Sequence, residues 1–313
     1  MISVTDRALK GYIFDIQGLS VHDGPGCRTL IFMKGCTLNC SWCSNPEGIH
    51  LNPDVLYTVS KCILCGNCIE NCPQQAIQIR EGMHFIDHEL CKICLSHSCV
   101  DDCHTGALRI CGYEISVDQI MDIIRRDRQF WGPDGGVTLS GGEPLLQIDF
   151  AAKILERCFD AYIHTAIETC GNVSWEHFER ILPWCDWIFF DLKNTNTDLH
   201  LAATGKPNTL IINNIKRLSQ FFTGKLILRL PLITGFNDSD ENIDAVISLM
   251  KETGITEINV LPLHHLGREK YVLLGRKYAG KDFVVPTQER LKEVRERFFK
   301  EGITCYLGSE TGF

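Results

Sequence analysis

The chain has 313 residues, which allows about two domains with a sizeable buried core. Hydrophobic residues make up 44% and charged residues 22%, values of ordinary globular proteins that exclude a disordered chain. With 31 basic and 39 acidic residues the net charge is −8, which argues against a nucleic acid or an anionic membrane as the partner.

The N-terminal sequence MISVTDRALKGYIFDIQGL lacks the apolar region of a signal peptide, and no run of about 18 apolar residues predicts a membrane span. We therefore expect a cytoplasmic protein. Its 17 cysteines are unusual for a chain of this length. Because the cytoplasm keeps thiols reduced, clustered cysteines there indicate metal sites rather than disulfides.

Apolar runs that predict strands alternate with segments of helical period over most of the chain. The predicted strands are residues 29–34, 137–140, 163–168, 187–192, 226–233 and 257–263. The predicted helices are 117–130, 148–159, 174–182, 208–222, 239–253 and 287–301, and Ser239 or Asp240 is expected to cap the fifth. Six β/α units predict an α/β protein with a parallel sheet, most simply a partial TIM-like (β/α)6 barrel.

Residues 52–110 interrupt this alternation after the first predicted strand. They carry two cysteine runs, each followed by a short apolar stretch, as in the two halves of a bacterial ferredoxin βαββαβ repeat. We expect them to form an inserted ferredoxin-like α+β domain with two [4Fe–4S] clusters. Residues 1–51 and 111–313 would then form the barrel.

Three cysteines with the spacing Cys36-x3-Cys40-x2-Cys43 follow the first predicted strand. A cubane cluster held by three thiolates keeps one iron open, and catalysis at a cluster requires such an open position. The alternative is a zinc site completed by His50 or His22.

The two cysteine runs of the insert predict a pair of cubane clusters. The run Cys62-x2-Cys65-x2-Cys68-x3-Cys72-Pro73 has ferredoxin spacing, with zinc as the alternative, and the run Cys91-x2-Cys94-x4-Cys99-x3-Cys103 has two extra residues. In paired runs the fourth cysteine of each ligates the other cluster. We therefore expect one cluster on Cys62, Cys65, Cys68 and Cys103, and the other on Cys91, Cys94, Cys99 and Cys72.

Polar motifs follow the predicted strands, at the end where (β/α) barrels carry their chemistry. Besides the three-cysteine loop they are Ser140-Gly141-Gly142-Glu143-Pro144, Glu168-Thr169, Asp191-Leu192-Lys193 and Leu263-His264-His265. Each alone has a structural explanation, such as a turn, a surface ion pair or a rim histidine. Because all of them fall on one face of one barrel, they predict an active site.

These motifs resemble those of the radical S-adenosylmethionine (SAM) enzymes, whose signature matches the first cysteine group. More narrowly, the sequence resembles the activating enzymes of glycyl radical enzymes, and the insert resembles the subset that activates 4-hydroxyphenylacetate decarboxylase and glycerol dehydratase type enzymes. The matching segments are DGPGCRT (23–29), KGCTLNCSWCSNPE (34–47), GGVTLSGGEPLLQ (135–147), HTAIETCG (164–171), DLK (191–193), LRLPLITGFND (228–238) and LPLHHLG (261–267).

The resemblance implies an oxidoreductase in which the α-amino and α-carboxylate groups of SAM chelate the open iron. Reductive cleavage of SAM would yield methionine and a 5′-deoxyadenosyl radical, which takes a hydrogen from a backbone glycine of a partner enzyme. The implied catalytic residues are Cys36, Cys40, Cys43 and Lys193. The implied SAM contacts are Trp42, Cys43, Ser44, Gly141, Gly142, Glu143, Glu168, Asp191, Lys193, Arg229 and His264.

Individual roles follow from the same resemblance. Trp42 is expected near the adenine, and the two glycines are expected to let backbone approach the methionine amino group, from which Glu143 would accept. Glu168, Thr169 and Asp191 match a monovalent-cation site, in which Glu168 replaces the usual Asp. Asp23 is expected near the glycyl loop of the partner. His265 and Cys170 are expected to be structural.

The resemblance also implies a partner glycyl radical enzyme, with flavodoxin or ferredoxin as electron donor and the extra clusters as an electron relay. It implies a monomeric, oxygen-sensitive protein of an anaerobic organism. The third cysteine run, Cys27 and the terminal TCYLGSETGF resemble the activators of arylacetate decarboxylases. Glycerol, propanediol, hydroxyproline, choline and isethionate enzymes remain alternative partners. Another peptide-modifying radical SAM enzyme or an iron–sulfur electron carrier are the alternative functions.

Overall fold

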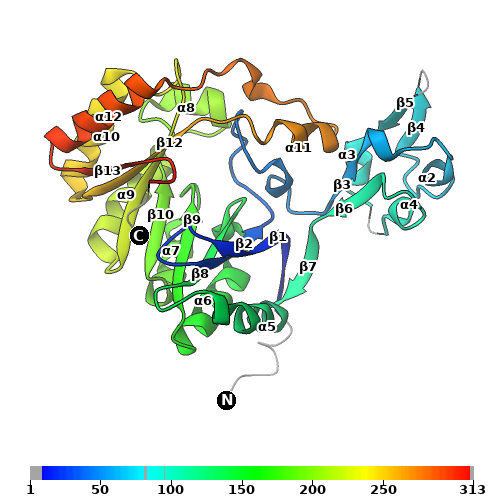
Figure 1. The fold of residues 1–313 in the computed structure, drawn as a ribbon, viewed down its shortest axis with the longest axis horizontal. Helices are drawn as coiled ribbons and strands as arrows, with labels where there is room; N and C mark the ends of the chain where they lie inside the picture. Colours follow the sequence, from blue (N-terminus) through cyan, green and yellow to red (C-terminus); the bar gives the residue numbers. More distant parts are fainter. Residues whose placement is uncertain (1–8, 81–82, 95, 311–313) are drawn as a thin grey trace.

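A computed structural model describes residues 9–80, 83–94 and 96–310. Its main sheet has the strand order β13-β12-β11-β10-β9-β8-β2-β1-β7 (Figure 1). Neighbours from β2 to β13 are parallel, whereas β1 and β7 form an antiparallel edge. The strands are β1 (Lys10–Ser20), β2 (Arg28–Met33), β7 (Tyr113–Ser116), β8 (Gly136–Gly141), β9 (His164–Thr169), β10 (Trp187–Asp191), β11 (Lys225–Leu232), β12 (Glu257–Pro262) and β13 (Thr304–Leu307). The sheet is open, as in a partial barrel.

The six predicted parallel strands are confirmed, each to within about two residues of its expected bounds. The prediction of six was too small, because β13 adds a seventh parallel strand beside β12. Four residues are too short a run to stand out in the sequence. The antiparallel strands β1 and β7 were also missed, and β7 is as short as β13.

The six predicted helices are confirmed and lie on the outer side of the sheet (Figure 1). They are α5 (Val117–Asp127), α6 (Ile148–Asp160), α7 (Trp175–Ile181), α9 (Thr209–Phe221), α10 (Asp240–Thr253) and α12 (Gln288–Lys300). Ser239 caps α10, since its side chain accepts from the amide of Asn242. Two short helices, α8 (Thr197–Thr204) and α11 (Arg268–Leu273), follow strand ends and were not predicted. One continuous apolar core joins the helices to the outward-facing strand residues.

The inner face of the sheet changes character along the strands. Successive side chains of a strand point to opposite faces, so every second residue faces inward. Ala166, Phe189 and Ile227 form a buried apolar cluster there. Two residues further along the same strands come Glu168, Asp191 and Arg229. The carboxyl ends of the strands therefore present charged groups above an apolar floor.

Between β2 and β7 the chain forms a separate group of small elements, at the right in Figure 1. They are β3 (Asp54–Tyr57), α2 (Asn67–Glu70), β4 (Ile77–Arg80), β5 (Met83–Ile86), α3 (His88–Cys91), α4 (Ser98–Asp101) and β6 (Leu108–Cys111). β3 pairs with β6 and β4 pairs with β5, both antiparallel. Their own buried cluster combines Val55, Ala76, Ile77 and Leu108 with Cys68, Cys72, Cys91 and Cys99.

A buried ion-pair network joins this group to the barrel. Lys34, which is 0% exposed, lies 2.9 Å from Asp54 at the start of β3 and donates to the carbonyl of Glu47. Arg276 donates to the other Asp54 oxygen at 2.5 Å. Lys34 and Arg276 belong to the barrel, and Asp54 begins the small group, so the network spans the junction.

Within the described ranges, no helix is both long and apolar enough to cross a lipid bilayer.

Asp54→Asn should lower the free energy of unfolding by about 3 kcal/mol, because it leaves the buried Lys34 ammonium without a carboxylate. Urea unfolding of the cluster-free protein under reducing conditions measures the difference. Glu114→Gln, which breaks the exposed Lys10–Glu114 pair, is the matched control and should change the free energy little. Equal effects of the two substitutions would contradict a structural role for the junction network.

Candidate functional site

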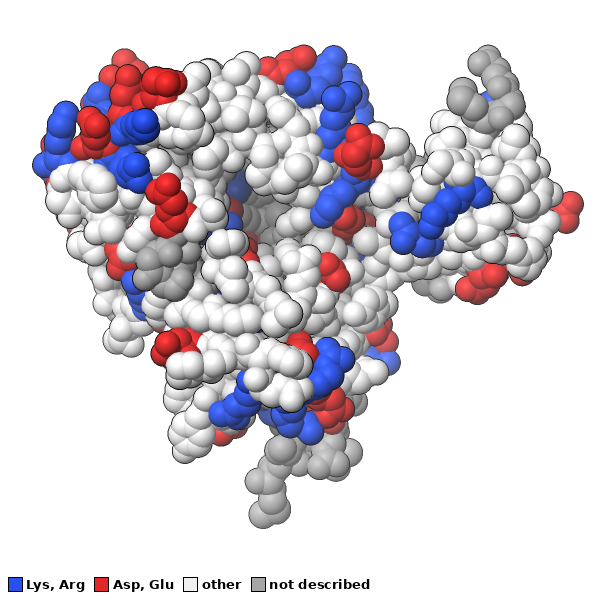
Figure 2. Space-filling model, in the orientation of Figure 1, with Lys and Arg blue, Asp and Glu red and all other residues white. Residues whose placement is uncertain are grey.

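A cavity of about 600 Å³ opens at the carboxyl ends of the parallel strands. Figure 2 shows it as a hollow with acidic and basic atoms at its wall. Nearly all predicted site residues of the barrel line it: Asp23, Cys36, Cys40, Trp42, Cys43, Ser44, Gly141, Gly142, Glu168, Thr169, Asp191, Lys193, Arg229 and His264. Glu143 is the exception. The cavity volume lies within the usual range of small-molecule sites.

The three cysteines of the β2 loop share one wall of the cavity. Burial raises the pKa of Cys40 to about 12 and that of Cys43 to about 11. A hydrogen bond with Cys170 lowers the pKa of Cys36, although burial opposes this effect. Thiols in such surroundings become thiolates when metal binds them.

Within the part of the chain that the structure describes, no three His, Cys, Asp or Glu side chains lie close enough to hold a single metal ion. A cubane makes a different demand, because each of its thiolate ligands binds a separate iron.

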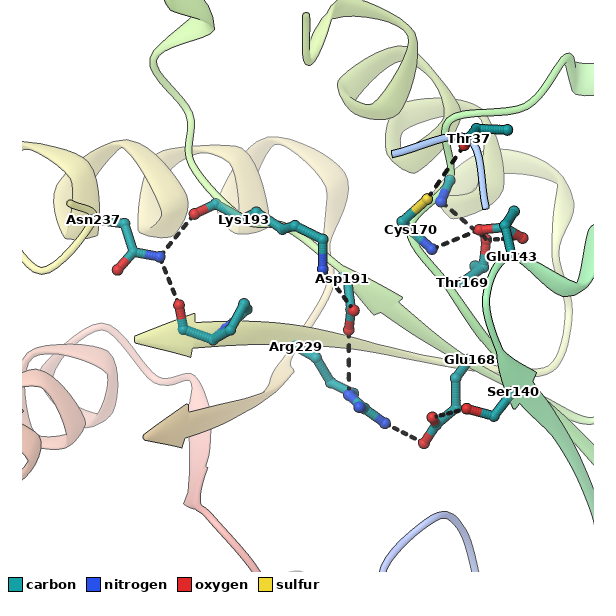
Figure 3. Close-up of polar contacts among 12 residues, drawn as sticks. Thr37, Ser140, Glu143, Glu168, Thr169, Cys170, Asp191, Lys193, Arg229 and Asn237 are labelled. Carbon is teal, nitrogen blue, oxygen red and sulfur yellow. Dashed lines mark hydrogen bonds and ion pairs between the residues drawn. The ribbon is translucent and has the colours of Figure 1, made fainter. Parts of the chain in front are cut away.

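Two acids and two bases form a network on the inner face of the sheet (Figure 3). The Ser140 hydroxyl donates to one oxygen of Glu168 at 2.6 Å, and Arg229 donates to the other. The Arg229 Nε atom also lies 3.3 Å from Asp191, whose second oxygen accepts from Lys193 at 3.0 Å. The parallel register pairs Asp191 with Arg229 on adjacent strands, so strand pairing itself creates this contact.

Burial and pairing shift the pKa values of these groups. Burial, together with the nearby Asp23 carboxyl, raises the pKa of Glu168 to about 7 against the opposing effect of Arg229. Burial also acts to raise the pKa of Asp191, but Lys193 and Arg229 outweigh it, so the net shift is downward. Burial acts to lower the pKa of Lys193, yet Asp191 outweighs it and the net shift is upward. At neutral pH Lys193 and Arg229 are therefore cations and Asp191 is an anion.

The loop that carries Asp23 into the cavity is held by Arg28, which sequence reasoning did not select. Arg28 is 0% exposed and donates to the Thr138 hydroxyl and the Pro25 carbonyl, each at 2.8 Å. The Thr138 hydroxyl in turn donates to the Asp23 carbonyl at 2.7 Å, and Ser20 donates to the Asp23 carboxylate. The only signal for Arg28 was its place inside DGPGCRT.

Glu143 lies behind the cavity wall and is 0% exposed. Its carboxylate accepts from the Thr169 hydroxyl at 2.9 Å, the Cys170 amide at 2.8 Å and the Leu145 amide at 3.1 Å (Figure 3). These contacts tie the β8 loop to the end of β9. The predicted contact of Glu143 with the SAM ammonium has no counterpart in this arrangement and stays a prediction.

Gly141 and Gly142 line the cavity, but close packing of the chain alone already requires glycine at both positions. A Cβ on Gly141, whose φ is +109°, would lie 2.4 Å from the Met33 amide nitrogen. A Cβ on Gly142 would lie 2.1 Å from the Gly35 carbonyl oxygen. The two glycines thus let the end of β8 pack against the cysteine loop, a reason separate from the predicted approach of SAM.

The loop that carries the three cysteines also brings an aromatic side chain to the cavity, and Cys40 packs against its cluster. Trp42 is 7% exposed, and its ring packs 5.0 Å from that of Phe236 and 5.8 Å from that of Phe283. His264 is exposed at the cavity rim. His265 instead contacts the Tyr278 hydroxyl at 3.0 Å and the Phe283 carbonyl at 3.1 Å, a packing role like the one predicted.

Asn259 on β12 is a cavity residue that sequence reasoning missed. It is 4% exposed, and its buried Oδ1 atom has no hydrogen-bond partner among the described residues. Strand register places it beside Arg229. An unsatisfied acceptor in a cavity is available to a ligand. Its signal was weak, because an Asn in a strand has no distinctive spacing.

The insert cysteines lie in two sets. Cys62, Cys65, Cys68 and Cys103 line a cavity of about 70 Å³. Burial and then the charges of Cys72 and Cys94 raise the pKa of Cys91 to about 11. Burial and then Cys72, Cys91 and Cys94 raise that of Cys99 to about 12. Cys103 of the second run thus lies with the first three cysteines of the first run, and the charge of Cys72 of the first run acts on Cys91 and Cys99 of the second.

Comparisons with known proteins agree on the type of protein. The family profile described as "Radical SAM superfamily" matches residues 30–250. The chain is 42% identical to a 4-hydroxyphenylacetate decarboxylase activating enzyme of Clostridioides difficile (strain CD196), over 99% of both chains. It is 38% identical to an indoleacetate decarboxylase activating enzyme of Tractidigestivibacter scatoligenes, over 96% of this chain and 98% of that one.

Among solved structures, a radical SAM methyltransferase from Sphaerobacter thermophilus has a similar fold. Its TM-score is 0.53 at 16% identity, with 90% of this chain and 66% of that chain covered. This likeness concerns the fold alone.

Glu168→Gln should remove a pH dependence of stability. The folded pKa of about 7 exceeds the ordinary value of 4.5, so the native state binds this proton more tightly than the unfolded state. The resulting stabilisation is full below about pH 4.5 and is lost as pH rises through about 7. We expect the wild-type melting temperature to fall more steeply over this interval than that of the variant. Glu252→Gln, at an exposed ion pair, is the control and should follow the wild type.

Proposed function

Because the chain belongs to the radical SAM superfamily and, within it, to the activating enzymes of glycyl radical enzymes, we propose that its partner is an arylacetate decarboxylase. The supporting observation is the 42% identity to a 4-hydroxyphenylacetate decarboxylase activating enzyme over 99% of both chains. The indoleacetate relative acts on the same chemical class of partner by its name. The enzyme is an oxidoreductase, and its family uses a [4Fe–4S] cluster and SAM.

Cys36, Cys40 and Cys43 would hold the catalytic cluster, and the fit is good. The three thiols share one wall of a cavity large enough for a small ligand, and beside them lie a cation and unsatisfied polar atoms. When bound, the cluster supplies the electron that splits SAM into methionine and the 5′-deoxyadenosyl radical, which takes a hydrogen from a glycine of the partner. The chain must orient SAM, exclude water and admit the partner's glycyl loop.

The polar end of SAM is matched by the charged network. Lys193 is buried and Arg229 is partly buried, and both cations would bind the methionine carboxylate, whereas Asp191 would face the ammonium or ribose side. Asp191 Oδ1 and Arg229 Nε face each other as an ion pair at 3.3 Å without hydrogen-bond geometry, so each can still bond a ligand. Gly141 and Gly142 would border the methionine moiety.

The adenine would lie beside Trp42. Trp42 offers an apolar ring surface, and Ser44 and His264 line the same space. Asp23, on the loop braced by Arg28, would meet the glycyl loop of the partner.

The monovalent cation predicted near Glu168, Thr169 and Asp191 does not fit this arrangement and stays a prediction. Arg229 already lies between the two carboxylates, and the Thr169 hydroxyl donates to Glu143. A metal cation there would face the guanidinium directly.

Residues 52–110 would form a ferredoxin-like domain with two auxiliary [4Fe–4S] clusters, and residues 1–51 and 111–313 the barrel. Residues 1–8 and 311–313 lie outside the described ranges. Two observations support the auxiliary clusters: the grouping of the thiols into two sets of four, and the antiparallel pairs β3–β6 and β4–β5. We assign Cys62, Cys65, Cys68 and Cys103 to one cluster and Cys72, Cys91, Cys94 and Cys99 to the other.

The auxiliary clusters would relay electrons from flavodoxin or ferredoxin to the catalytic cluster. The junction of Lys34, Asp54 and Arg276 supports this role, because its ion pairs join the insert to the barrel. We further propose a monomeric cytoplasmic protein that works without oxygen, since an open iron is exposed to oxidants.

Anaerobic mixing with an arylacetate decarboxylase of the glycyl radical type, SAM and dithionite should produce the doublet EPR signal of a glycyl radical. The same decarboxylase with its radical glycine changed to alanine is the control and should give no doublet. A signal obtained only with an isethionate sulfite-lyase would overturn the assigned partner but not the activating function. No 5′-deoxyadenosine release with SAM and dithionite would overturn the function itself.

Anaerobic reconstitution should give on the order of twelve irons per chain, from three cubanes. Replacing Cys36, Cys40 and Cys43 together by Ala should leave on the order of eight irons and abolish 5′-deoxyadenosine release. Cys158→Ala, at a fully buried thiol outside the three groups, should retain the wild-type iron content. A wild-type value near four would remove the auxiliary clusters from the proposal.

A further inference from the structure

A histidine of the insert faces the thiols assigned to one auxiliary cluster. His84 on β5 has its Nδ1 atom 3.2 Å from the sulfur of Cys62 and its Nε2 atom 3.8 Å from the sulfur of Cys68. Whichever ring nitrogen carries the proton of a neutral imidazole, a ligand sulfur lies within reach of it. The Tyr57 and His84 rings meet edge to face at 5.5 Å.

Strand pairing within the insert shows which residue corresponds to His84 in the other half of the βαββαβ repeat. Because β3 pairs with β6 as β5 pairs with β4, a pseudo-twofold axis maps β3 onto β5. The first residue of each strand pairs with the last of its partner strand, so His84 corresponds to Val55. Val55 is 1% exposed and buried among cysteines of the insert. An alkyl side chain cannot donate a hydrogen bond.

Backbone hydrogen bonds to the thiols do not make the same distinction. In the set of cysteines that His84 faces, the amide of Leu64 donates to Cys62 at 3.4 Å and that of Leu108 donates to Cys103 at 3.3 Å.

In the other set of cysteines, the amide of Ala76 donates to Cys72 at 3.2 Å and that of His97 donates to Cys94 at 3.4 Å. Each set of cysteines thus has two backbone donors within the described ranges. The two sets differ in the side chain that faces them, His84 or Val55.

The two sets of cysteines also differ in their distance from the barrel. Cys91, which belongs to the set that His84 does not face, lies at the end of α3. His88 of the same helix packs against Gly275 of the barrel. The helix α2, which carries Cys68 of the other set, lies on the far side of the insert together with α4, β4 and β5 (Figure 1). We call the cluster assigned to Cys72, Cys91, Cys94 and Cys99 the inner cluster. The one assigned to Cys62, Cys65, Cys68 and Cys103 is the outer cluster.

We propose that His84 donates an N–H···S hydrogen bond to the outer cluster's cysteine thiolates and thereby holds its reduction potential above that of the inner cluster. The physical reason is charge: reduction makes a cluster more negative, and a donor to its sulfurs stabilises that state. The outer cluster is then reduced first. The inference rests on the proposed auxiliary clusters and goes beyond them, because it makes the two inequivalent.

EPR-monitored redox titration of the fully reconstituted protein tests the inference, with iron content measured on each sample. His84→Val copies the Val55 environment. It should retain wild-type iron and move one auxiliary potential downward by at least the equivalent of a tenfold change in the reduction equilibrium, about 59 mV. His84→Gln keeps an N–H donor and should recover most of the shift. His104→Val, at an exposed histidine beside the same cavity, is the matched control and should change no potential.

Unchanged potentials in an iron-replete His84→Val protein would overturn the inference and leave the auxiliary clusters standing. Loss of about four irons from that variant would also overturn it, since His84 would then hold the cluster itself. A wild-type protein with about four irons would instead refute the auxiliary clusters, a failure of the proposed function that the iron assay identifies separately.

Discussion

Arg229 lies between two carboxylates on the inner face of the sheet, and the active-site face depends on this contact. Parallel pairing of β10 and β11 puts Arg229 beside Asp191, and β9 brings Glu168 to its other end. Charges in such a buried place need partners, because an unpaired one is strongly destabilising. Arg229 provides the shared partner, and the Ser140 hydroxyl and Lys193 complete the pairing. The network therefore determines which side chains can point into the cavity.

This network suits a ligand that carries both charges. Lys193 and Arg229 face Asp191 and Glu168, so basic and acidic side chains already lie next to each other in the cavity. The amino acid end of SAM is a zwitterion, and its carboxylate and ammonium can each take over a contact that a side chain now makes. Preorganised charges of this kind orient a ligand at small reorganisation cost. Arg28 extends the same principle to the Asp23 loop, where a buried guanidinium braces backbone carbonyls.

The insert follows a different logic. Half of its apolar core consists of cysteines, so its packing and its proposed metal ligands are the same residues. Its link to the barrel includes the buried ion pairs of Asp54 with Lys34 and Arg276. Within it, a near-repeat of topology carries unlike side chains at equivalent positions, His84 against Val55. Equivalent backbones can thus give clusters of unequal properties.

The sequence by itself determined the parallel β/α order, the outer helices and the residues that gather at the strand ends. Period-two and period-3.6 patterns are local, and parallel strands bring their carboxyl ends to one edge, so Glu168, Asp191 and His264 could be assigned to one face. Only the tertiary structure decided how they pair. Glu143 lies behind the cavity wall, because its carboxylate accepts from the buried amide of Cys170 after β9. Arg229 came between the carboxylates through strand register. Asn259, Arg28 and His84 emerged only in three dimensions, because their partners lie far along the chain or in another strand, where no spacing rule reaches.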